Sequence, residues 1–567
     1  MRAHAVALLL VLLLAGAAPA ATHARRGATL PFLEYQAEQA KTDGTILGPS
    51  RAFGTLAAEA SAREAVRLRA GSFVEFALRA PANAVDVRYS IPDSVDGAGT
   101  TAPLEVEADG AKLATLTLTS AYGWFYGGYP FTNRPRDGGA HHLFDDTRAL
   151  LGVTLRAGTK VRLVATTATV IDLADFEQVA RPLAQPAGSL AVTDFGADPS
   201  GARDATSAFQ TALDAGRAQR RAVWIPPGTF TVTRHLIVDD VTLEGAGPWY
   251  SVLHGDGVGV YGSPAPHPST HVRLADFAIF GEVRDRVDSA QVNGIGGALG
   301  GASVVSDLWI QHTKVGMWLD GPFDGLLVTG CRIQDTTADG INLHQGIGHA
   351  AVENTFVRNT GDDGLALWSD ASRGAAPVHD VSFRFDTVEL PILANGIALY
   401  GGRDDVVSDD LVEDTLSEGG GIHVGNRFSS TPLGGTTTIA RDTIVRSGSM
   451  NASIETPIGA LWFYGQDLPL TGKVAVTDTT IRDSSYAAIQ FYGSSVSNVR
   501  LDRVRIDRAG TFGLQVQANG GVRLAHVRAT RLGAAGVYLC PSANAFRIAG
   551  RGTGLRTRYC GPFPHPR

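Results

Sequence analysis

Three aspartates, Asp339, Asp362 and Asp363, have a spacing that could support catalysis. Asp339 and Asp363 each precede a glycine that begins a short apolar segment, and they lie 24 residues apart. If 24 residues make one coil of a stacked structure, the two aspartates occupy equivalent positions on neighbouring strands, which lie about 4.7–4.9 Å apart. Carboxylates this close repel each other, so one of them should have a raised pKa unless a cation or a water molecule bridges them.

A cluster of carboxylates is suited to cleaving a glycosidic bond. One protonated carboxyl donates to the leaving oxygen while another carboxylate activates water, and in inverting enzymes the two groups lie about 6.5–9.5 Å apart. We assign Asp362 as the general acid, and Asp339 and Asp363 as the groups that hold and deprotonate the water. Because the three groups interact, their pKa values belong to the cluster as a whole. Two alternatives stay open, namely Asx turns at the Asp-Gly pairs and a calcium ion held between coils.

A repeated unit of glycine, apolar residue, any residue and apolar residue sets the positions of these aspartates. The units begin at Gly316, Gly340, Gly364, Gly396, Gly421, Gly459, Ala488, Gly513 and Gly536. The steps between them are 24, 24, 32, 25, 38, 29, 25 and 23 residues. A step near 24 residues indicates one coil of a parallel β-helix, and single coils must stack because none can bury its apolar face alone. We attribute the glycine to a turn that needs a permissive backbone, and the two longest steps to loops on one face.

The segments ahead of the repeat fit the start of such a solenoid. Residues 204–213 have helical periodicity, and residues 223–230 resemble a strand. We expect the helix to cover the open end of the solenoid, where an exposed strand edge would invite aggregation. The sequence therefore predicts a right-handed parallel β-helix over residues 189–560, and the spacing of a leucine-rich repeat is absent.

Residues 30–183 differ in their sequence pattern from the repeat region. Short runs of alternating apolar and polar residues, such as 72–78 and 112–118, are separated by loops rich in Gly, Pro, Asp and Asn. Regularly spaced short strands of this kind predict a β-sandwich. The stretch 184–188 (Ala-Gln-Pro-Ala-Gly) is interpreted as a linker. The whole chain is thus predicted to be all-β, with a sandwich ahead of the β-helix.

Aromatic and polar residues on the same or neighbouring units are candidates for binding sugar rings. Trp368 and Tyr400 end their predicted strands, while Trp462 lies within an apolar run that is typical of the core. We expect the substrate-binding residues to be Trp368, Tyr400, Asn342, His344 and His423.

Bulk properties restrict the location and the partners. Residues 1–24 resemble a secretory signal peptide, with Arg2 followed by a short apolar stretch and small residues at a cleavage site. No later segment is apolar enough to span a membrane. With 49 basic and 56 acidic residues, the net charge of −7 argues against nucleic acid as a partner. We expect a secreted, extracellular monomer that is free of the membrane once the signal is cleaved.

The chain has three cysteines, an odd number for an exported protein. Cys540 and Cys560 flank a turn-rich C-terminal stretch, and we expect them to form a disulfide in an oxidising compartment. Cys331 lies in an apolar run and is interpreted as a small buried residue.

The aspartate motifs resemble a known family. Residues 338–342 (Ala-Asp-Gly-Ile-Asn) and 359–366 (Asn-Thr-Gly-Asp-Asp-Gly-Leu-Ala) are similar to the catalytic signature of glycoside hydrolase family 87, the α-1,3-glucanases and mycodextranases. Residues 243–253 also resemble that family. The resemblance implies an inverting endo-hydrolase of α-1,3-glucan or nigeran that uses three aspartates, at Asp339, Asp362 and Asp363, with no cofactor required for catalysis.

Residues 30–183 are similar to carbohydrate-binding module family 35, with residues 35–38 matching its opening strand and 171–177 its closing strand. Such modules often carry a structural calcium ion, which would implicate Glu38 and Asp172. The aromatic stretch 122–130 could bind glucan, but we expect it to pack against the β-helix.

Other functions remain possible from the residues alone. A polygalacturonase-like hydrolase could use the same aspartate pattern. A polysaccharide lyase would need a basic residue beside the aspartates, yet Lys314 and Lys473 are the only lysines after residue 188. A non-catalytic glucan-binding protein would use the aspartates as turn residues or calcium ligands.

Overall fold

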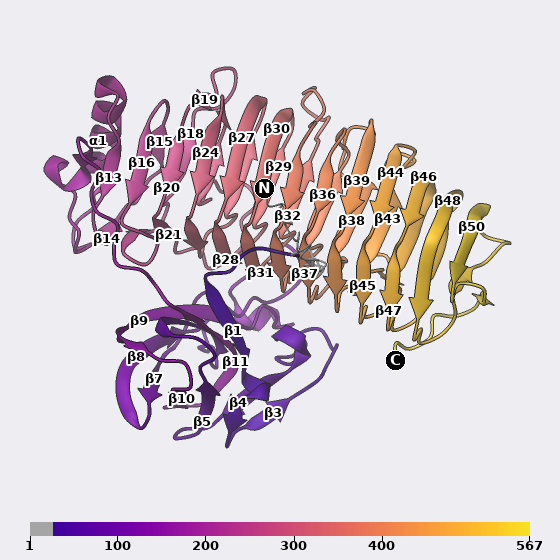
Figure 1. Ribbon diagram of the computed structural model, residues 1–567, viewed down its shortest axis with the longest axis horizontal. Helices are drawn as coiled ribbons and strands as arrows, with labels where there is room; N and C mark the ends of the chain where they lie inside the picture. Colours follow the sequence, from indigo (N-terminus) through magenta and orange to yellow (C-terminus); the bar gives the residue numbers. More distant parts are fainter. Residues whose placement is uncertain (1–25) are drawn as a thin grey trace, which may run out of the picture.

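The computed structural model describes residues 26–567, so the predicted signal peptide lies outside the described residues. A β-sandwich lies beside a long parallel β-helix, at the lower edge of the β-helix in Figure 1. The prediction of an all-β protein with these two parts is confirmed. No helix within residues 26–567 is long and apolar enough to cross a membrane.

The sandwich consists of two antiparallel sheets around their own core. One sheet has the order β3 (Thr45–Leu47), β4 (Ala65–Leu68), β11 (Thr169–Glu177), β6 (Ala82–Ser90) and β9 (Asp145–Leu155), with β1 (Phe32–Gln36) paired to β11. The other has the order β2 (Lys41–Thr42), β5 (Phe73–Ala77), β10 (Lys160–Ala165), β7 (Thr101–Ala108) and β8 (Ala111–Thr119). Alternate residues of β7, such as Leu104 and Val106, face the core because successive side chains of a strand point to opposite faces.

The β-helix is a 36-stranded sheet whose strands stack in three columns. The first column includes β22 (Ile295–Gly297), β26 (Met317–Asp320), β29 (Ile341–His344), β32 (Leu365–Trp368), β35 (Ile397–Tyr400), β38 (Ile422–Asn426) and β43 (Leu461–Gly465). The second includes β24 (Ser303–Ser306), β27 (Phe323–Thr329), β30 (Ile347–Glu353), β33 (Ser382–Arg384), β36 (Val406–Ser408) and β39 (Thr436–Ala440). The third includes β21 (Ala278–Phe280), β25 (Trp309–Gln311), β28 (Arg332–Thr336), β31 (Phe356–Thr360), β34 (Thr387–Glu389), β37 (Leu411–Glu413) and β40 (Thr443–Val445).

The repeated glycines precede strands of the first column, and the units that they begin pair in register from one coil to the next. Gly340 and Gly364 immediately precede β29 and β32, and Ile341 pairs with Leu365 in parallel. A Cβ atom on Gly340 would lie 2.4 Å from the carbonyl oxygen of Gly364 and 2.6 Å from a methyl carbon of Val357. Neither glycine has a positive φ. The turn therefore requires glycine because the next coil approaches closely, and the expectation of a permissive backbone was wrong.

Helix α1 (Thr206–Gln219) covers the N-terminal end of the solenoid, as expected (Figure 1). Asp204 accepts a hydrogen bond from the backbone N–H of Thr206 at 2.9 Å and so supports the start of the helix. Phe209 and Leu213 are buried, and the ring of Phe209 packs edge-on against Phe230 at 5.3 Å. The helix thereby closes the apolar core that runs inside the coils.

Buried charges join the sandwich to the third column of the β-helix. Arg358 of β31 is fully buried, and its guanidinium lies 2.7 Å from Asp146 and 2.9 Å from Asp175 of the sandwich. Conversely, Arg88 of β6 in the sandwich donates a hydrogen bond to the side-chain oxygen of Asn359 in the β-helix, at 2.9 Å. Because an unpaired buried charge is very unfavourable, these contacts fix how the two parts meet.

The aromatic stretch 122–130 packs against the β-helix, as expected. The ring of Tyr122 stacks on His312 with centroids 3.8 Å apart, and the hydroxyl of Tyr129 donates to Asp288.

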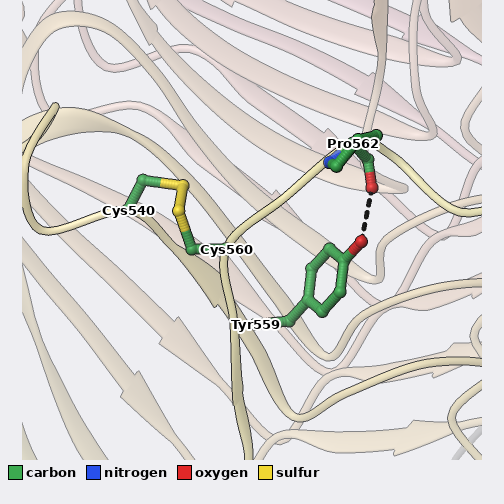
Figure 2. Close-up of a disulfide and its surroundings, with 4 residues drawn as sticks. All are labelled: Cys540, Tyr559, Cys560 and Pro562. Atoms are coloured by element: carbon green, nitrogen blue, oxygen red, sulfur yellow. Dashed lines mark hydrogen bonds between the residues drawn. A yellow bond between two sulfur atoms is a disulfide. The ribbon is translucent and has the colours of Figure 1, made fainter.

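At the C-terminal end, a disulfide joins Cys540 to Cys560, and the hydroxyl of Tyr559 donates to the carbonyl of Pro562 at 2.8 Å (Figure 2). The thiol of Cys331 is buried and unpaired with another cysteine.

Candidate active site

The three aspartates meet at the start of two neighbouring strands. Asp339 lies two residues before β29, and Asp362 and Asp363 lie just before β32. The backbone N–H of Gly340 donates to the carbonyl of Asp363 at 3.0 Å, and that of Asp362 to Ala338 at 3.2 Å. One carboxylate oxygen from each aspartate lies within 4.8 Å of the others. This is closer than the separation of about 6.5–9.5 Å expected for an inverting pair.

Asp339 is a buried carboxyl with two acidic neighbours, which makes its ionised form unfavourable. Its carboxyl is buried, and Asp362 and Asp363 add negative charge beside it. Burial first, and these two neighbours second, raise the pKa of Asp339 well above its usual range. Arg286 and a 3.3 Å hydrogen bond from Asn342 act in the opposite direction. The cluster therefore holds a proton at a pH where isolated aspartates are ionised.

Asp363 is held by three donors. The backbone and side-chain amides of Asn395 donate to one oxygen at 2.7 and 2.9 Å, and the hydroxyl of Tyr400 donates to the other at 2.8 Å. Burial and Asp362 raise the pKa of Asp363 to about 7, while these hydrogen bonds lower it. Trp462 in turn donates to the side-chain oxygen of Asn395 at 2.7 Å. Asp363 is thus fixed in both position and orientation.

Asp362 is the most accessible of the three carboxylates, with 20% of its side chain exposed. Arg286 forms an ion pair with it at 2.7 Å and a second one with Asp288 at 2.8 Å. Arg286 comes from the segment between β21 and β22, and its guanidinium lies 4.8 Å above the ring of Tyr129. The sandwich therefore contributes a side chain to the surroundings of the catalytic cluster.

The aspartates lie in a cleft of about 880 Å³. Four of the five residues that we expected to bind substrate line it, namely Asn342, His344, Trp368 and Tyr400. The rings of His344, Trp318 and Trp368 pack against one another, with centroid distances of 5.2 Å from His344 to Trp318, 4.6 Å from His344 to Trp368 and 6.4 Å between the two tryptophans. All three rings line the cleft and form an aromatic wall, which suits the apolar faces of sugar rings.

The expectation that His423 contacts substrate was wrong. His423 has no exposed surface and packs between Trp462, at 4.1 Å, and Tyr400, at 5.3 Å. Burial lowers its pKa well below the usual range. Asn342 lines the cleft, whereas aromatic residues of the coils before and after His423 cover its ring.

Several residues of the site were not predicted from the sequence. Tyr129, Arg286, Asp288, Lys314, Asn395, Arg427 and Phe428 all line the cleft. Asn395 occupies the position before the repeat glycine that Asp339 and Asp363 occupy in their own units, so register alone could have indicated it. Arg286 and Tyr129 lie in irregular segments, where no periodicity indicates which way a side chain faces.

Asp172, one of the two residues expected to bind calcium, does not fit that ion. Asp172 forms a buried ion pair with Arg88, and both its oxygens accept the backbone N–H of Ser61, at 3.0 and 3.1 Å. A guanidinium already occupies the place that a cation would take. Asp172 instead neutralises a buried arginine at the contact between the sandwich and the β-helix.

Comparison with known proteins decides the family. The sequence matches the family model for α-1,3-glucanase catalytic domain D1 over residues 29–179 and that for domain D2 over residues 203–535. The chain belongs to the α-1,3-glucanases of glycoside hydrolase family 87. The catalytic unit of the thermostable α-1,3-glucanase from Streptomyces thermodiastaticus strain HF3-3 is 42% identical, with a TM-score of 0.88. That match covers 95% of this chain and all of the other.

Other solved structures extend this family comparison. The Agl-KA catalytic domain, 24% identical over 94% of this chain and 100% of its own, has the same fold with a TM-score of 0.84. A further family 87 α-1,3-glucanase is 26% identical over 93% of this chain and 99% of its own, with a TM-score of 0.82 in its complex with tetrasaccharides. Its aspartate-to-alanine variants were solved with tetrasaccharides or nigerose, and the replaced aspartates follow one another at intervals of 23 and 1 residues. A search of curated proteins found no match.

Proposed function

We propose that this chain hydrolyses α-1,3-glucosidic bonds in α-1,3-glucan or nigeran by inversion, with Asp339, Asp362 and Asp363 as the catalytic residues. The observation that carries the proposal is the convergence of three carboxylates in a cleft with an aromatic wall. Their intervals of 23 and 1 residues equal those of the aspartates replaced in the related glucanase.

The geometry supports a division of labour among the three. Asp362 is the most exposed and faces the open cleft, so we assign it as the general acid that protonates the leaving oxygen. Asp339 and Asp363 are buried at equivalent positions of neighbouring coils, and we assign them to hold and deprotonate the attacking water. The hydrogen bonds from Tyr400 and Asn395 orient Asp363 for this role.

Inversion needs its own test, because the short separation of the carboxylates does not itself favour it. Proton NMR during early hydrolysis of a soluble α-1,3-linked oligosaccharide distinguishes the outcomes. We expect the β-anomer to form first. Initial release of the α-anomer would mean a covalent glycosyl intermediate, and would overturn the assignment of Asp339 and Asp363 to water activation.

The role of Asp362 can be separated from that of the other two. We expect Asp362→Ala to lose activity on glucan but to retain much of it on a glucosyl substrate whose leaving group needs no protonation. Asp339→Ala and Asp363→Ala should lose activity on both substrates, because water activation is still required. Equal losses of all three variants on the activated substrate would refute Asp362 as the acid.

The substrate is tested by release of reducing ends from α-1,3-glucan and nigeran, beside laminarin and polygalacturonate. We expect release from the α-glucans only. Two of the cleft's cations are already engaged and so are not free for a uronate polymer, because Arg286 pairs with aspartates and the amine of Lys314 donates to the carbonyls of Asp288 and Ala290. Release from polygalacturonate alone would keep the chemistry and overturn the substrate assignment.

We also propose that the protein is secreted and acts as a monomer. The residues of the predicted signal peptide and the disulfide Cys540–Cys560 support export to an oxidising compartment. Detection in the medium and the mass measured by light scattering test these two points.

A further inference from the structure

Two histidines and two aspartates gather on the outside of the β-helix, and none of them lines the cleft. Asp324 belongs to β27, His349 to β30, and His379 and Asp380 lie just before β33. The coil register brings them together, since Asp324 pairs with Gly348, and Gly348 forms a parallel bridge with His379. Three successive coils therefore present these side chains at one place.

Three of their polar atoms converge on one point. His349 Nδ1 lies 2.6 Å from Asp324, which leaves Nε2 turned towards Asp380, at 4.0 Å. His379 Nδ1 lies 3.0 Å from the same Asp380 carboxylate. One atom each from His349, His379 and Asp380 lies within 4.8 Å of the other two. A single carboxylate thus faces two imidazoles.

Gly348 keeps this space open. A Cβ atom at this position would lie 2.6 Å from Oδ1 of Asp324 and 2.6 Å from a ring carbon of His379. Its φ lies outside the left-handed region, so the backbone does not demand glycine here. The residue instead provides the clearance that lets the imidazole and the carboxylate of adjoining coils lie over the same strand.

We propose that this cluster is a binding site for a zinc ion. Zinc in proteins is held by imidazole nitrogens and carboxylate oxygens at about 2.0–2.2 Å, in a tetrahedral set that water can complete. His349 Nε2, His379 Nδ1 and Asp380 supply three ligands. Asp324 orients His349 through its other nitrogen, the arrangement by which a second carboxylate commonly fixes a zinc-bound imidazole.

Ordinary surface ion pairing is a weaker explanation of the cluster. Exposed ion pairs contribute about 0–1 kcal/mol, too little to hold four side chains in one geometry. A zinc ion would join the coil of His349 to that of His379 at the base of the loop that follows β32. The same loop begins beside Trp368 and carries Arg373 into the cleft. The ion would therefore stabilise the fold next to the active site without touching substrate.

The test uses the full chain without a histidine tag, stripped of metal by a chelator and then dialysed against zinc. Bound zinc is measured by mass spectrometry of the metal. We expect the wild type to bind one zinc ion more than His349→Ala, His379→Ala and Gly348→Val. The control, His254→Ala, removes a comparably exposed histidine that faces Glu282, and it should bind as much zinc as the wild type. Asp324→Asn should weaken binding about 10–100-fold.

Two further readouts separate this site from other zinc binding. Zinc should raise the melting temperature of the wild type and of His254→Ala but not of His379→Ala, because a ligand of the folded state stabilises it. Glucanase activity without zinc should be the same in all these variants, which confirms that they fold. Equal zinc content in the wild type, His349→Ala and His379→Ala would overturn the proposal, as would a wild type that binds none.

Discussion

Arg286 and Asp362 form an ion pair of 2.7 Å at the open side of the catalytic cluster. Asp288 holds the same guanidinium at 2.8 Å, and Tyr129 of the sandwich donates to Asp288. Arg286 is thus a positioning residue that places a positive charge beside three carboxylates. Its charge also lowers the pKa of Asp339, which burial and the other two aspartates raise.

Replacing Arg286 by Gln should shift the pH dependence of catalysis. Without this cation, the pKa of Asp339 rises further, and the cluster keeps its proton to a higher pH. We expect the acid limb of kcat/KM to move up by about one pH unit, which is a tenfold change in protonation. Kinetics on a soluble oligosaccharide over a range of pH measures the shift. A matched control is Arg441→Gln, whose arginine pairs with Asp409 away from the cleft. A profile unchanged from that of the control would contradict the role of Arg286.

Tyr400→Phe should impair catalysis more than binding. The change removes the hydroxyl that donates to Asp363 at 2.8 Å and leaves the aromatic ring. Since that hydrogen bond lowers the pKa of Asp363, which stands at about 7, its loss keeps the group protonated to a higher pH. We expect kcat at neutral pH to fall about fivefold, because a rise of roughly one unit from a pKa near 7 lowers the ionised fraction from one half to about one eleventh, with little change in KM. Tyr492→Phe, outside the cleft, is the control. A rise in KM at constant kcat would instead indicate that the hydroxyl binds substrate.

Asp410→Asn should stabilise the protein at neutral pH. Asp410 is fully buried, and its Oδ1 accepts the backbone N–H of Asp386 at 2.7 Å, which an asparagine oxygen can also do. Burial raises the pKa of Asp410 well above its usual range. The unfolded chain releases this proton near pH 4, so the stability that Asp410 contributes at low pH is lost as the pH rises towards the folded value.

We therefore expect Asp410→Asn to raise the free energy of unfolding at pH 7 by about 1 kcal/mol or more, the worth of roughly one pKa unit. The gain should disappear below about pH 4, where the aspartate is protonated in both states. Urea unfolding at several pH values measures it. Asp256→Asn, at an exposed aspartate, should show no gain. A gain that is equal at every pH would show that titration is not its cause.

Arg358→Met should destabilise the protein severely. The substitution leaves Asp146 and Asp175 buried without the guanidinium that neutralises them, at 2.7 and 2.9 Å in the native state. Breaking a buried ion pair costs about 3–5 kcal/mol. Chemical unfolding measures the loss. Arg203→Met, at an exposed arginine paired with Asp198, should cost less than about 1 kcal/mol. Similar losses for the two variants would contradict the importance of the buried cluster.

The sequence predicted the features that repeat. Glycines at a step near 24 residues indicate stacked coils, and register alone then places Asp339 beside Asp363. The same reasoning failed at His423, because periodicity shows that a side chain points outward but not what covers it. The bulk of Trp462 and Tyr400 closes that face. Neighbouring coils, rather than the residue's own strand, determine its exposure.

Contacts between segments that are distant in the chain could not be predicted from the sequence. Arg88 meets Asn359 across 271 residues, and the loop that carries Arg286 has no periodicity. Asp172 shows the same limit, since a matching motif suggested calcium while the buried Arg88 supplies the positive charge instead. A motif identifies a kind of residue, but its partner is fixed by how the sandwich docks.

The charges buried between sandwich and β-helix also constrain how such proteins can be recombined. A foreign sandwich that lacked acidic residues matching Asp146 and Asp175 would leave Arg358 facing an apolar surface. It would also remove Tyr129 from the hydrogen-bonded chain that reaches Asp362 through Asp288 and Arg286. A chimera would therefore have to transplant both sides of the contact between the sandwich and the β-helix together.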